Sequence, residues 1–290
     1  MTSAVPMAPS SEQAGRATSP LWVEGRVPES LPDALHRSSL VEANWQRALF
    51  RLKTVGRFLV ELDKPTVVER AVGATDCDLE CFLRGPVAAL RLCLSGHFTL
   101  RGAAVEMGGR ALAVCGISTG ASSLAAAMAL EGHAVLADGV VCIEASPPAV
   151  ALVPEARPIR VTLWPDVVEA LGLDPSTGEV VRPALPSRAF SLGPPPPSQP
   201  VPLAALVSLS MDDGRRGAAA QPLTGFAAVA TLLKAFWHPH LVEDLGMAKE
   251  QFRWAATTAM AAPTVLLSLG EADVGTSLQT LVKAASGLMT

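Results

Sequence analysis

The stretch from Ala111 to Leu124, Ala-Leu-Ala-Val-Cys-Gly-Ile-Ser-Thr-Gly-Ala-Ser-Ser-Leu, decides how the chain is interpreted. An apolar run is followed by Gly116, several small residues and an alanine-rich segment, which predicts a strand, a tight loop and a helix. Backbone N–H groups and the helix dipole make such a loop suited to anions. The window up to Leu130 is uncharged and long enough to span a bilayer, but its small residues and central break predict a soluble core.

The loop matches part of the phosphate-loop pattern G-x-x-x-x-G-K-[ST]. Gly116 stands at the first glycine, and Ser123 stands at the hydroxyl that normally reaches a metal ion. Ala121 replaces the second glycine and Ser122 replaces the lysine. The residues expected to surround an anion are Gly116, Ser118, Thr119, Gly120, Ala121, Ser122 and Ser123.

The same residues also fit G-x-S-x-G, the nucleophile elbow of α/β-hydrolases, with Ser118 as the nucleophile. Partners in the chain order of that family are available, namely Asp212 or Asp213 followed by His238 or His240. No HGGG-type oxyanion segment precedes the elbow, which weakens this hypothesis. A plain tight turn of small residues is the third interpretation. As a metal pair, His238 and His240 lack a further ligand at a defined spacing.

Composition narrows the function classes. The 290 residues include 23 basic and 27 acidic side chains and are 49% hydrophobic, which excludes a wholly disordered chain. The balance gives no electrostatic footprint for nucleic-acid binding. Lysines stand only at positions 53, 64, 234, 249 and 283, so the region that contains the motifs has none.

Cysteine usage predicts a reducing compartment. The five cysteines are an odd number and are scattered, which argues against a disulfide framework and favours the cytoplasm. Cys77 and Cys81 have no second pair at metal-ligand spacing, so buried or incidental thiols are expected. Residues 1–20 are rich in Ser, Ala and Pro and lack the pattern of a secretory signal, so a disordered lead-in is expected.

Strand and helix signals alternate along the chain, which indicates an α/β or α+β domain. Strands are expected within 54–62, 134–143, 203–209 and 264–269, a hairpin at 103–115, and helices at 81–94, 124–130, 165–171 and from 224 onward. The four prolines 194–197 predict a stiff extended connector.

Five blocks outside the loop follow one another in a distinctive order. They are Phe82-Leu-Arg-Gly-Pro, Leu100-Arg-Gly-Ala-Ala-Val-Glu-Met-Gly-Gly-Arg-Ala, Glu131-Gly-His-Ala-Val-Leu-Ala-Asp-Gly-Val-Val, Leu163-Trp-Pro-Asp-Val-Val-Glu-Ala-Leu-Gly-Leu and Pro202-Leu-Ala-Ala-Leu-Val-Ser-Leu. Together they resemble the HPr kinase-like family, in particular small standalone members of bacterial biosynthetic clusters, including lasso-peptide kinases. The resemblance covers roughly residues 54–269.

The resemblance implies an α/β, P-loop-containing fold like that of phosphoenolpyruvate carboxykinase and HPr kinase, with a central mixed sheet flanked by helices. It implies a disordered lead-in at 1–20, an N-terminal α+β segment at 21–100 and a P-loop domain at 101–290. For active members it implies phosphorylation of a hydroxyl with ATP and magnesium. Ser123 and Asp138 stand at the matching positions for a metal ligand and for the residue that assists the attacking hydroxyl.

Three positions depart from the family. Arg101 replaces a histidine, Ser122 replaces the phosphate-loop lysine, and Gly139 replaces the second of two aspartates after the first, Asp138. Phosphoryl transfer depends on positioning and on neutralising phosphate charge, so these losses are severe. Arg101 is the candidate replacement contact for phosphate, and the alternative is a surface arginine at the start of a strand.

The leading hypothesis is therefore an HPr-kinase-like protein with lost or impaired kinase activity, in which Asp138 is a vestigial base and ATP and Mg²⁺ bind weakly or not at all. It would bind a biosynthetic enzyme, a peptide or a small-molecule substrate, and no nucleic acid or membrane. The alternatives are an active ATP/Mg-dependent kinase with a rebuilt phosphate site and, less favoured, a Ser118 hydrolase. Homo-oligomer formation is left open by the sequence.

Overall fold

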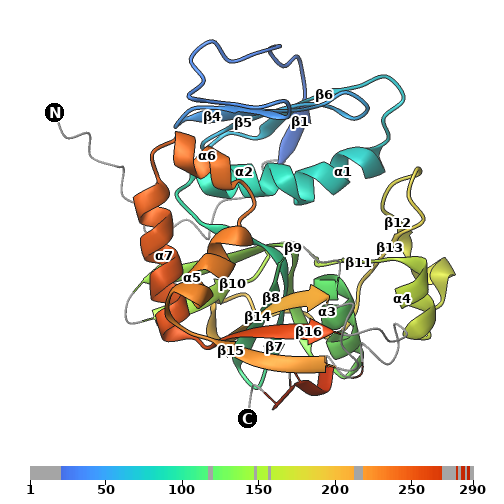
Figure 1. Cartoon of the computed structure of the whole chain (residues 1–290). Helices are drawn as coiled ribbons and strands as arrows, with labels where there is room; N and C mark the ends of the chain where they lie inside the picture. Colours follow the sequence, from blue (N-terminus) through green and yellow to red (C-terminus); the bar gives the residue numbers. More distant parts are fainter. Residues whose placement is uncertain are drawn as a thin grey trace.

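Two large β-sheets with helices between them make up the protein (Figure 1). The structure is a computed structural model that describes residues 21–116, 120–146, 149–155, 158–211 and 218–269, together with 279, 282–284 and 286–287. All statements on the structure refer to these residues.

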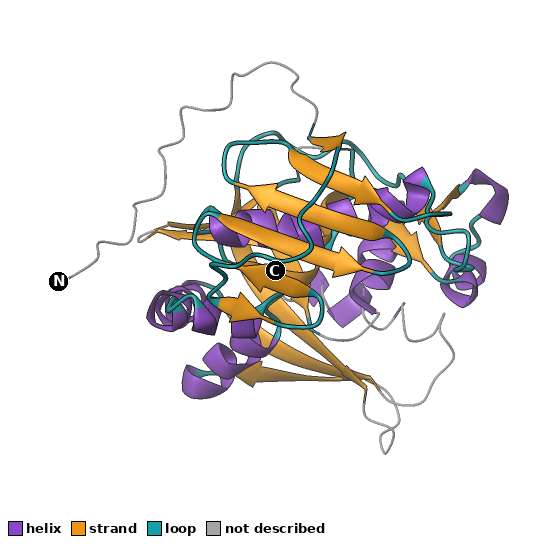
Figure 2. Cartoon of the chain, turned by 90° about the horizontal axis from the view of Figure 1, so that it is seen from above, coloured by secondary structure: helices purple, strands orange, loops and turns teal. Residues whose placement is uncertain are grey.

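The first sheet is formed by residues 22–70 in the order β1-β6-β5-β4-β3-β2, and neighbouring strands are antiparallel except β1 and β6. Along β5, buried and half-buried side chains alternate, as expected for a sheet with one face on the core. Figure 2 shows this sheet from above, with helices beneath it. Its strands are β1 (Trp22–Glu24), β2 (His36–Arg37), β3 (Val41–Ala43), β4 (Arg47–Leu52), β5 (Gly56–Glu61) and β6 (Thr66–Arg70).

Two helices, α1 (Asp76–Arg84) and α2 (Pro86–Leu94), follow the first sheet. The prediction of one helix over 81–94 is therefore wrong. The chain breaks at Gly85, and Pro86 begins α2 because proline is tolerated only in the first turn of a helix. α1 starts earlier than predicted because Thr75 and Asp78 form a reciprocal capping box.

The central sheet has seven strands in the order β10-β9-β7-β8-β14-β16-β15. β8, β14 and β16 are parallel to one another and the other pairs are antiparallel, so the sheet is mixed, as predicted. The start of β14 also pairs with β10, which closes five of the strands into a ring. The strands are β7 (Thr99–Met107), β8 (Arg110–Cys115), β9 (Ala134–Ser146), β10 (Ala149–Val153), β14 (Val201–Met211), β15 (Ala218–Leu223) and β16 (Thr264–Leu269).

Helices cover both faces of this sheet (Figure 1). One face packs on α3 (Gly120–Leu130), whose alanines and Leu124 are buried against it. The other face packs on α2 and on α5 (Gly225–Lys234), α6 (Pro239–Asp244) and α7 (Ala248–Ala261). A third, small sheet lies beside α4 (Pro165–Ala170) and consists of β11 (Val161–Leu163), β12 (Glu179–Val180) and β13 (Arg188–Phe190), with the 3-10 turn η2 (Pro175–Thr177).

The hairpin predicted at 103–115 is confirmed as β7 and β8, with Gly108 and Gly109 in the turn at positive φ. The predicted strand at 264–269 has the bounds of β16. The window 111–130 is divided between β8 and α3, and within the described ranges no helix is long and apolar enough to cross a membrane. The domain boundary expected at residue 100 falls inside β7, and one hydrophobic cluster joins Phe58 of the first sheet to Leu100 of the second. The division into domains stays a prediction.

Candidate functional site

The strand and the helix predicted on the two sides of the loop are β8 and α3. The strand ends at Cys115, Gly116 has a φ of +130°, and α3 begins at Gly120. The parallel strand β14 runs beside this turn. A Cβ added to Gly116 would lie 3.5 Å from the carbonyl oxygen of Leu209 in β14. Residues 117–119, which include the predicted Ser118 and Thr119, lie outside the described residues, and so do Asp212 and Asp213.

The first turn of α3 and the middle of β9 are joined by a hydrogen bond between two predicted site residues. The Oγ of Ser122 donates to Oδ1 of Asp138 at 2.6 Å. The second carboxylate oxygen accepts the backbone N–H of Thr162, in β11, at 3.0 Å. Ser122, in the position of the phosphate-loop lysine, is thus bound to the carboxylate, and each oxygen of Asp138 has a donor.

Burial raises the pKa of the Asp138 carboxyl from its usual 3.8 to about 6, and the hydrogen bonds from Ser122 and Thr162 offset part of this effect. A carboxyl with this pKa exchanges its proton near neutral pH. A general base needs this property, but a structural carboxyl in an apolar setting has it as well.

Arg101 lies at the beginning of β7 and is bound to Trp237. Its guanidinium carbon is 5.0 Å from the centre of the indole ring, and its Nη2 donates to the Trp237 carbonyl at 2.9 Å. The indole Nε1 in turn donates to the carbonyl of Gly139 at 2.9 Å. In the described part of the chain, no carboxylate forms an ion pair with Arg101, and its Nε is buried without a partner. Arg101 is therefore a half-buried arginine in contact with an aromatic ring, in place of the surface arginine considered above.

The backbone explains why these groups lie together. Residues 235–237, between α5 and α6, run beside the beginning of β7, where the N–H of Arg101 donates to the carbonyl of Ala235 and the N–H of Trp237 donates to that of Thr99. The N–H of Gly116 donates to the carbonyl of Arg101 at 3.2 Å. Arg101 thus connects the turn after β8 with Trp237.

The predicted magnesium ligands, Ser123 and Asp138, both lie in the described part of the chain. The only acidic side chain among the predicted site residues is Asp138, and both of its oxygens already accept hydrogen bonds. Ser123 is buried in the first turn of α3, and Gly139 supplies no ligand. Over the described ranges, no group of three His, Cys, Asp or Glu side chains could hold a metal ion, and this includes Cys77 and Cys81.

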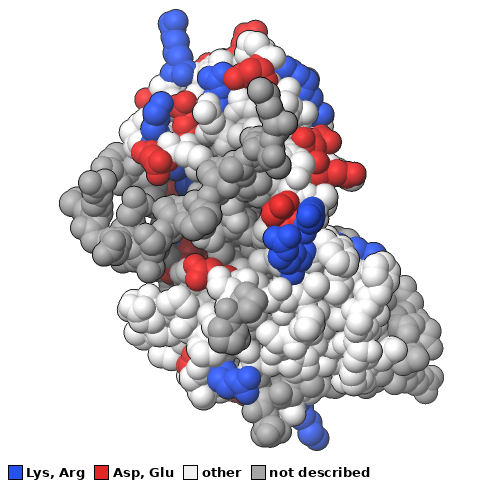
Figure 3. All heavy atoms as spheres, turned by 90° about the vertical axis from the view of Figure 1, so that its left-hand side faces the viewer, with Lys and Arg blue, Asp and Glu red and all other residues white. Residues whose placement is uncertain are grey.

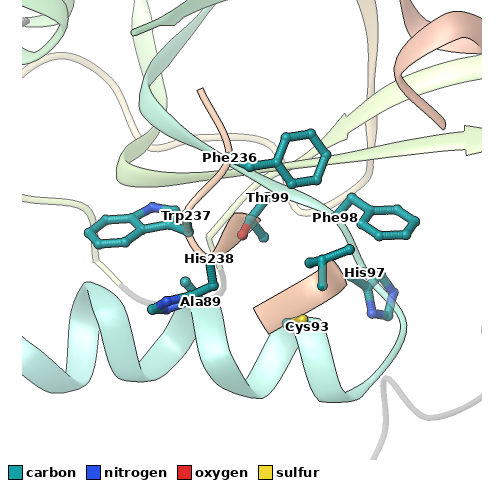
Figure 4. Close-up of a pocket in the computed structure, with 9 residues that line it drawn as sticks. Ala89, Cys93, His97, Phe98, Thr99, Phe236, Trp237 and His238 are labelled. Atoms are coloured by element: carbon teal, nitrogen blue, oxygen red, sulfur yellow. The ribbon is translucent and has the colours of Figure 1, made fainter. Parts of the chain in front are cut away.

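His238 and His240, the alternative histidines of the hydrolase hypothesis, lie in different environments. His238 lines a small cavity of about 10 Å³ together with Trp237, Ala89 and Cys93. Figure 4 shows the His238 ring beside Ala89. Nε2 of His238 lies 3.2 Å from the carbonyl oxygen of Pro86, and burial lowers its pKa to about 4. His240 is exposed and lies 4.0 Å from Glu243.

Two residues of this arrangement were not identified from the sequence. Thr162 contributes only its backbone N–H, which no sequence pattern marks. Trp237 is distant in sequence from both of its partners, and only its position beside a proline-containing helix start pointed to a loop.

No family model matches the chain, and no curated protein matches it. Among solved structures, the chain is similar to the HPr(Ser) kinase/phosphatase from Coxiella burnetii. The two share 12% sequence identity and a TM-score of 0.30, over 66% of this chain and 90% of the other.

Proposed function

We propose that the chain is an HPr-kinase-like protein of the cytoplasm whose hydroxyl kinase activity is lost or strongly impaired. It acts as a binding or regulatory partner of a biosynthetic enzyme, a peptide or a small molecule in a bacterial biosynthetic pathway. The sequence blocks described above and the strand, loop and helix around Gly116 support the kinase-like frame.

One observation carries the proposed loss of activity. The Oγ of Ser122 is committed to Asp138 at the position where a kinase of this kind needs a lysine for the phosphates. A neutral hydroxyl brings no positive charge, and removing one such electrostatic contact typically lowers the rate on the order of 10²–10³-fold. Arg101 is the candidate replacement, but its Nη2 and its planar face contact Trp237, so we propose that it does not take the role of the lysine.

The alternative, an active kinase with a rebuilt site, has one observation in its favour. The carboxyl of Asp138, in β9, is hydrogen-bonded to Ser122 in the first turn of α3. Its pKa of about 6 is suited to a general base. In that alternative, nucleotide binding would displace Ser122 from the carboxylate and leave Asp138 free to accept the proton of a substrate hydroxyl.

The decisive experiment compares nucleotide binding before and after the missing groups are restored. ATP is titrated by calorimetry, with and without Mg²⁺, into the parent protein and into the variant Ser122→Lys/Gly139→Asp. A Cβ at residue 139 meets no atom within 4 Å, and its φ of +87° is tolerated better by Asp than by most residues. The matched control is Ser122→Met/Gly139→Asp, which has a long side chain without the charge.

We expect binding only in the variant with lysine. Tight Mg-dependent binding and phosphoryl transfer by the parent protein would refute the proposed loss and favour the alternative. Equal binding by the lysine and methionine variants would show that the charge at position 122 does not matter.

A further inference from the structure

Among the described strands, the central sheet ends at β15, whose outer edge has no partner strand there. The sheet order ends with this strand, whose one partner among the described strands is β16. Its residues 218–223, Ala-Ala-Ala-Gln-Pro-Leu, contain no charge. Edge strands are usually protected by charged side chains, bulges or proline, because their unpaired N–H and C=O groups can pair with another chain.

Pro222 shows which backbone groups are free. Proline lacks an N–H and is found in sheets with its nitrogen toward the open edge. In an antiparallel strand, alternate residues direct their N–H and C=O groups to the same side. The outward groups of β15 are therefore the carbonyl of Pro222 and both the N–H and carbonyl groups of Ala218 and Ala220.

Two exposed apolar side chains lie near one end of β15 and β16. Leu223, the last residue of β15, pairs with Thr264, the first residue of β16. α5 begins shortly after Leu223, and α7 ends shortly before Thr264. Phe226 in α5 and Met260 in α7 are therefore near the same end of the sheet. The side chain of Phe226 is 77% exposed and that of Met260 is 88% exposed. Large apolar side chains in such a position typically mark an interaction site.

The described segments next to β15 are uncharged, whereas Asp212, Asp213, Arg215 and Arg216 precede the strand in the sequence. No charged residue occurs in 217–233 or in 254–270, the segments that contain β15, α5 and the end of α7. Figure 3 views the side of α5 and α7, and the lower half of this side is largely without Lys, Arg, Asp or Glu, whereas the upper half, over the first sheet, has many. A two-fold axis brings the residues closest to it against their own copies, where like charges would repel, and residues 218–223 carry no charge.

We propose that two copies of this chain form a dimer in which the β15 edges pair antiparallel about a two-fold axis near Ala220. With Ala220 opposite its own copy, Ala218 stands opposite Pro222, so both outward N–H groups find carbonyl acceptors. Phe226 and Met260 lose water contact beside the paired edges. The result is one continuous sheet through both copies, and the dimer is independent of the kinase question because it does not involve Ser122 or Asp138.

The test is the molar mass of the full chain in solution, measured by light scattering at about 50 µM protein, where a dimer of micromolar affinity predominates. We expect twice 30.1 kDa for the parent. Ala220→Pro removes the central outward N–H, and Phe226→Glu/Met260→Glu places charges in the contact. Each variant is expected to raise the dimer dissociation constant at least about 30-fold.

The matched control is Val72→Glu, at a fully exposed apolar position between the first sheet and α1, and it should leave the dimer intact. Thermal unfolding confirms that each variant is folded, and the surface variant Phe226→Glu/Met260→Glu remains informative if Ala220→Pro does not fold. A monomeric parent protein overturns the proposal, even if β15 then accepts a heterologous peptide. A dimer that survives the double glutamate variant overturns it as well.

Discussion

The buried carboxyl of Asp138 makes the stability of the protein depend on pH in an unusual direction. Its pKa is raised from 3.8 to about 6 in the folded state. Because the unfolded chain is then the stronger acid, raising the pH through this window lowers the free energy of unfolding, and lowering the pH restores it. Most native carboxylates have depressed pKa values and act in the opposite direction.

The magnitude follows from the size of the shift. At 1.36 kcal/mol per pKa unit, the change from 3.8 to about 6 is worth about 3 kcal/mol over the whole window. The side chain keeps some contact with water, so this figure is an upper limit. Between about pH 5 and pH 7.5, linkage assigns about 1 kcal/mol of the total to this one group.

Asp138→Asn isolates the effect. The Asn Oδ1 can accept the Thr162 N–H, and its Nδ2 can donate to Ser122 Oγ, so both hydrogen bonds remain while the ionisation is removed. Urea unfolding of both proteins at several pH values gives the difference between their stabilities. We expect Asp138→Asn to gain about 1 kcal/mol relative to the parent as the pH rises from about 5 to about 7.5. A difference that does not change with pH would refute the reasoning.

Two further predictions concern glycines of the central sheet and the reactivity of the thiols. Gly102→Ala is expected to destabilise the protein by about 3 kcal/mol or more in urea unfolding, because its Cβ would lie 1.9 Å from the Val114 carbonyl oxygen. Gly108→Ala, where nothing lies within 4 Å and only the φ of +58° is unfavourable, should cost about 1 kcal/mol, and equal costs would contradict this account. Iodoacetamide at about pH 8 should label the half-buried Cys77 in the native protein, as read by mass spectrometry. Burial raises the pKa of the Cys93, Cys115 and Cys142 thiols to about 12. Labelling of these three thiols as fast as Cys77 would contradict the prediction.

The central sheet could be predicted where the sequence signal is local. The hairpin of β7 and β8 has a Gly-Gly turn between two apolar runs, and β16 is a short apolar strand after a proline. Gly85-Pro86 also marks the break between α1 and α2 in the sequence, whereas the apolar periodicity over 81–94 predicts one continuous helix. Proline at that place fixed the start of a new helix.

Other features depend on contacts between distant segments. Most strands of the first sheet are short, with several charged residues, and they become strands because they pair with one another over the core. The closure of β10 on β14 and the contact of Trp237 with Arg101 join segments about 50 and 136 residues apart. No local pattern encodes such pairings, so a single sequence predicts the elements better than their arrangement.

The substitutions around α3 are physically consistent with one another. Under the proposed function, a lysine at position 122 would bring the positive charge that faces phosphate, and Ser122 brings none. The Ser122 hydroxyl satisfies one carboxylate oxygen, the Thr162 N–H satisfies the other, and a pKa of about 6 lets a proton reduce the remaining charge. Asp138 therefore has a structural reason to be present, because it accepts the N–H of Thr162 beside β9. The presence of Asp138 alone is therefore not evidence for catalysis. Nucleotide binding by the parent protein and by the variant Ser122→Lys/Gly139→Asp distinguishes the proposed loss of activity from the active-kinase alternative.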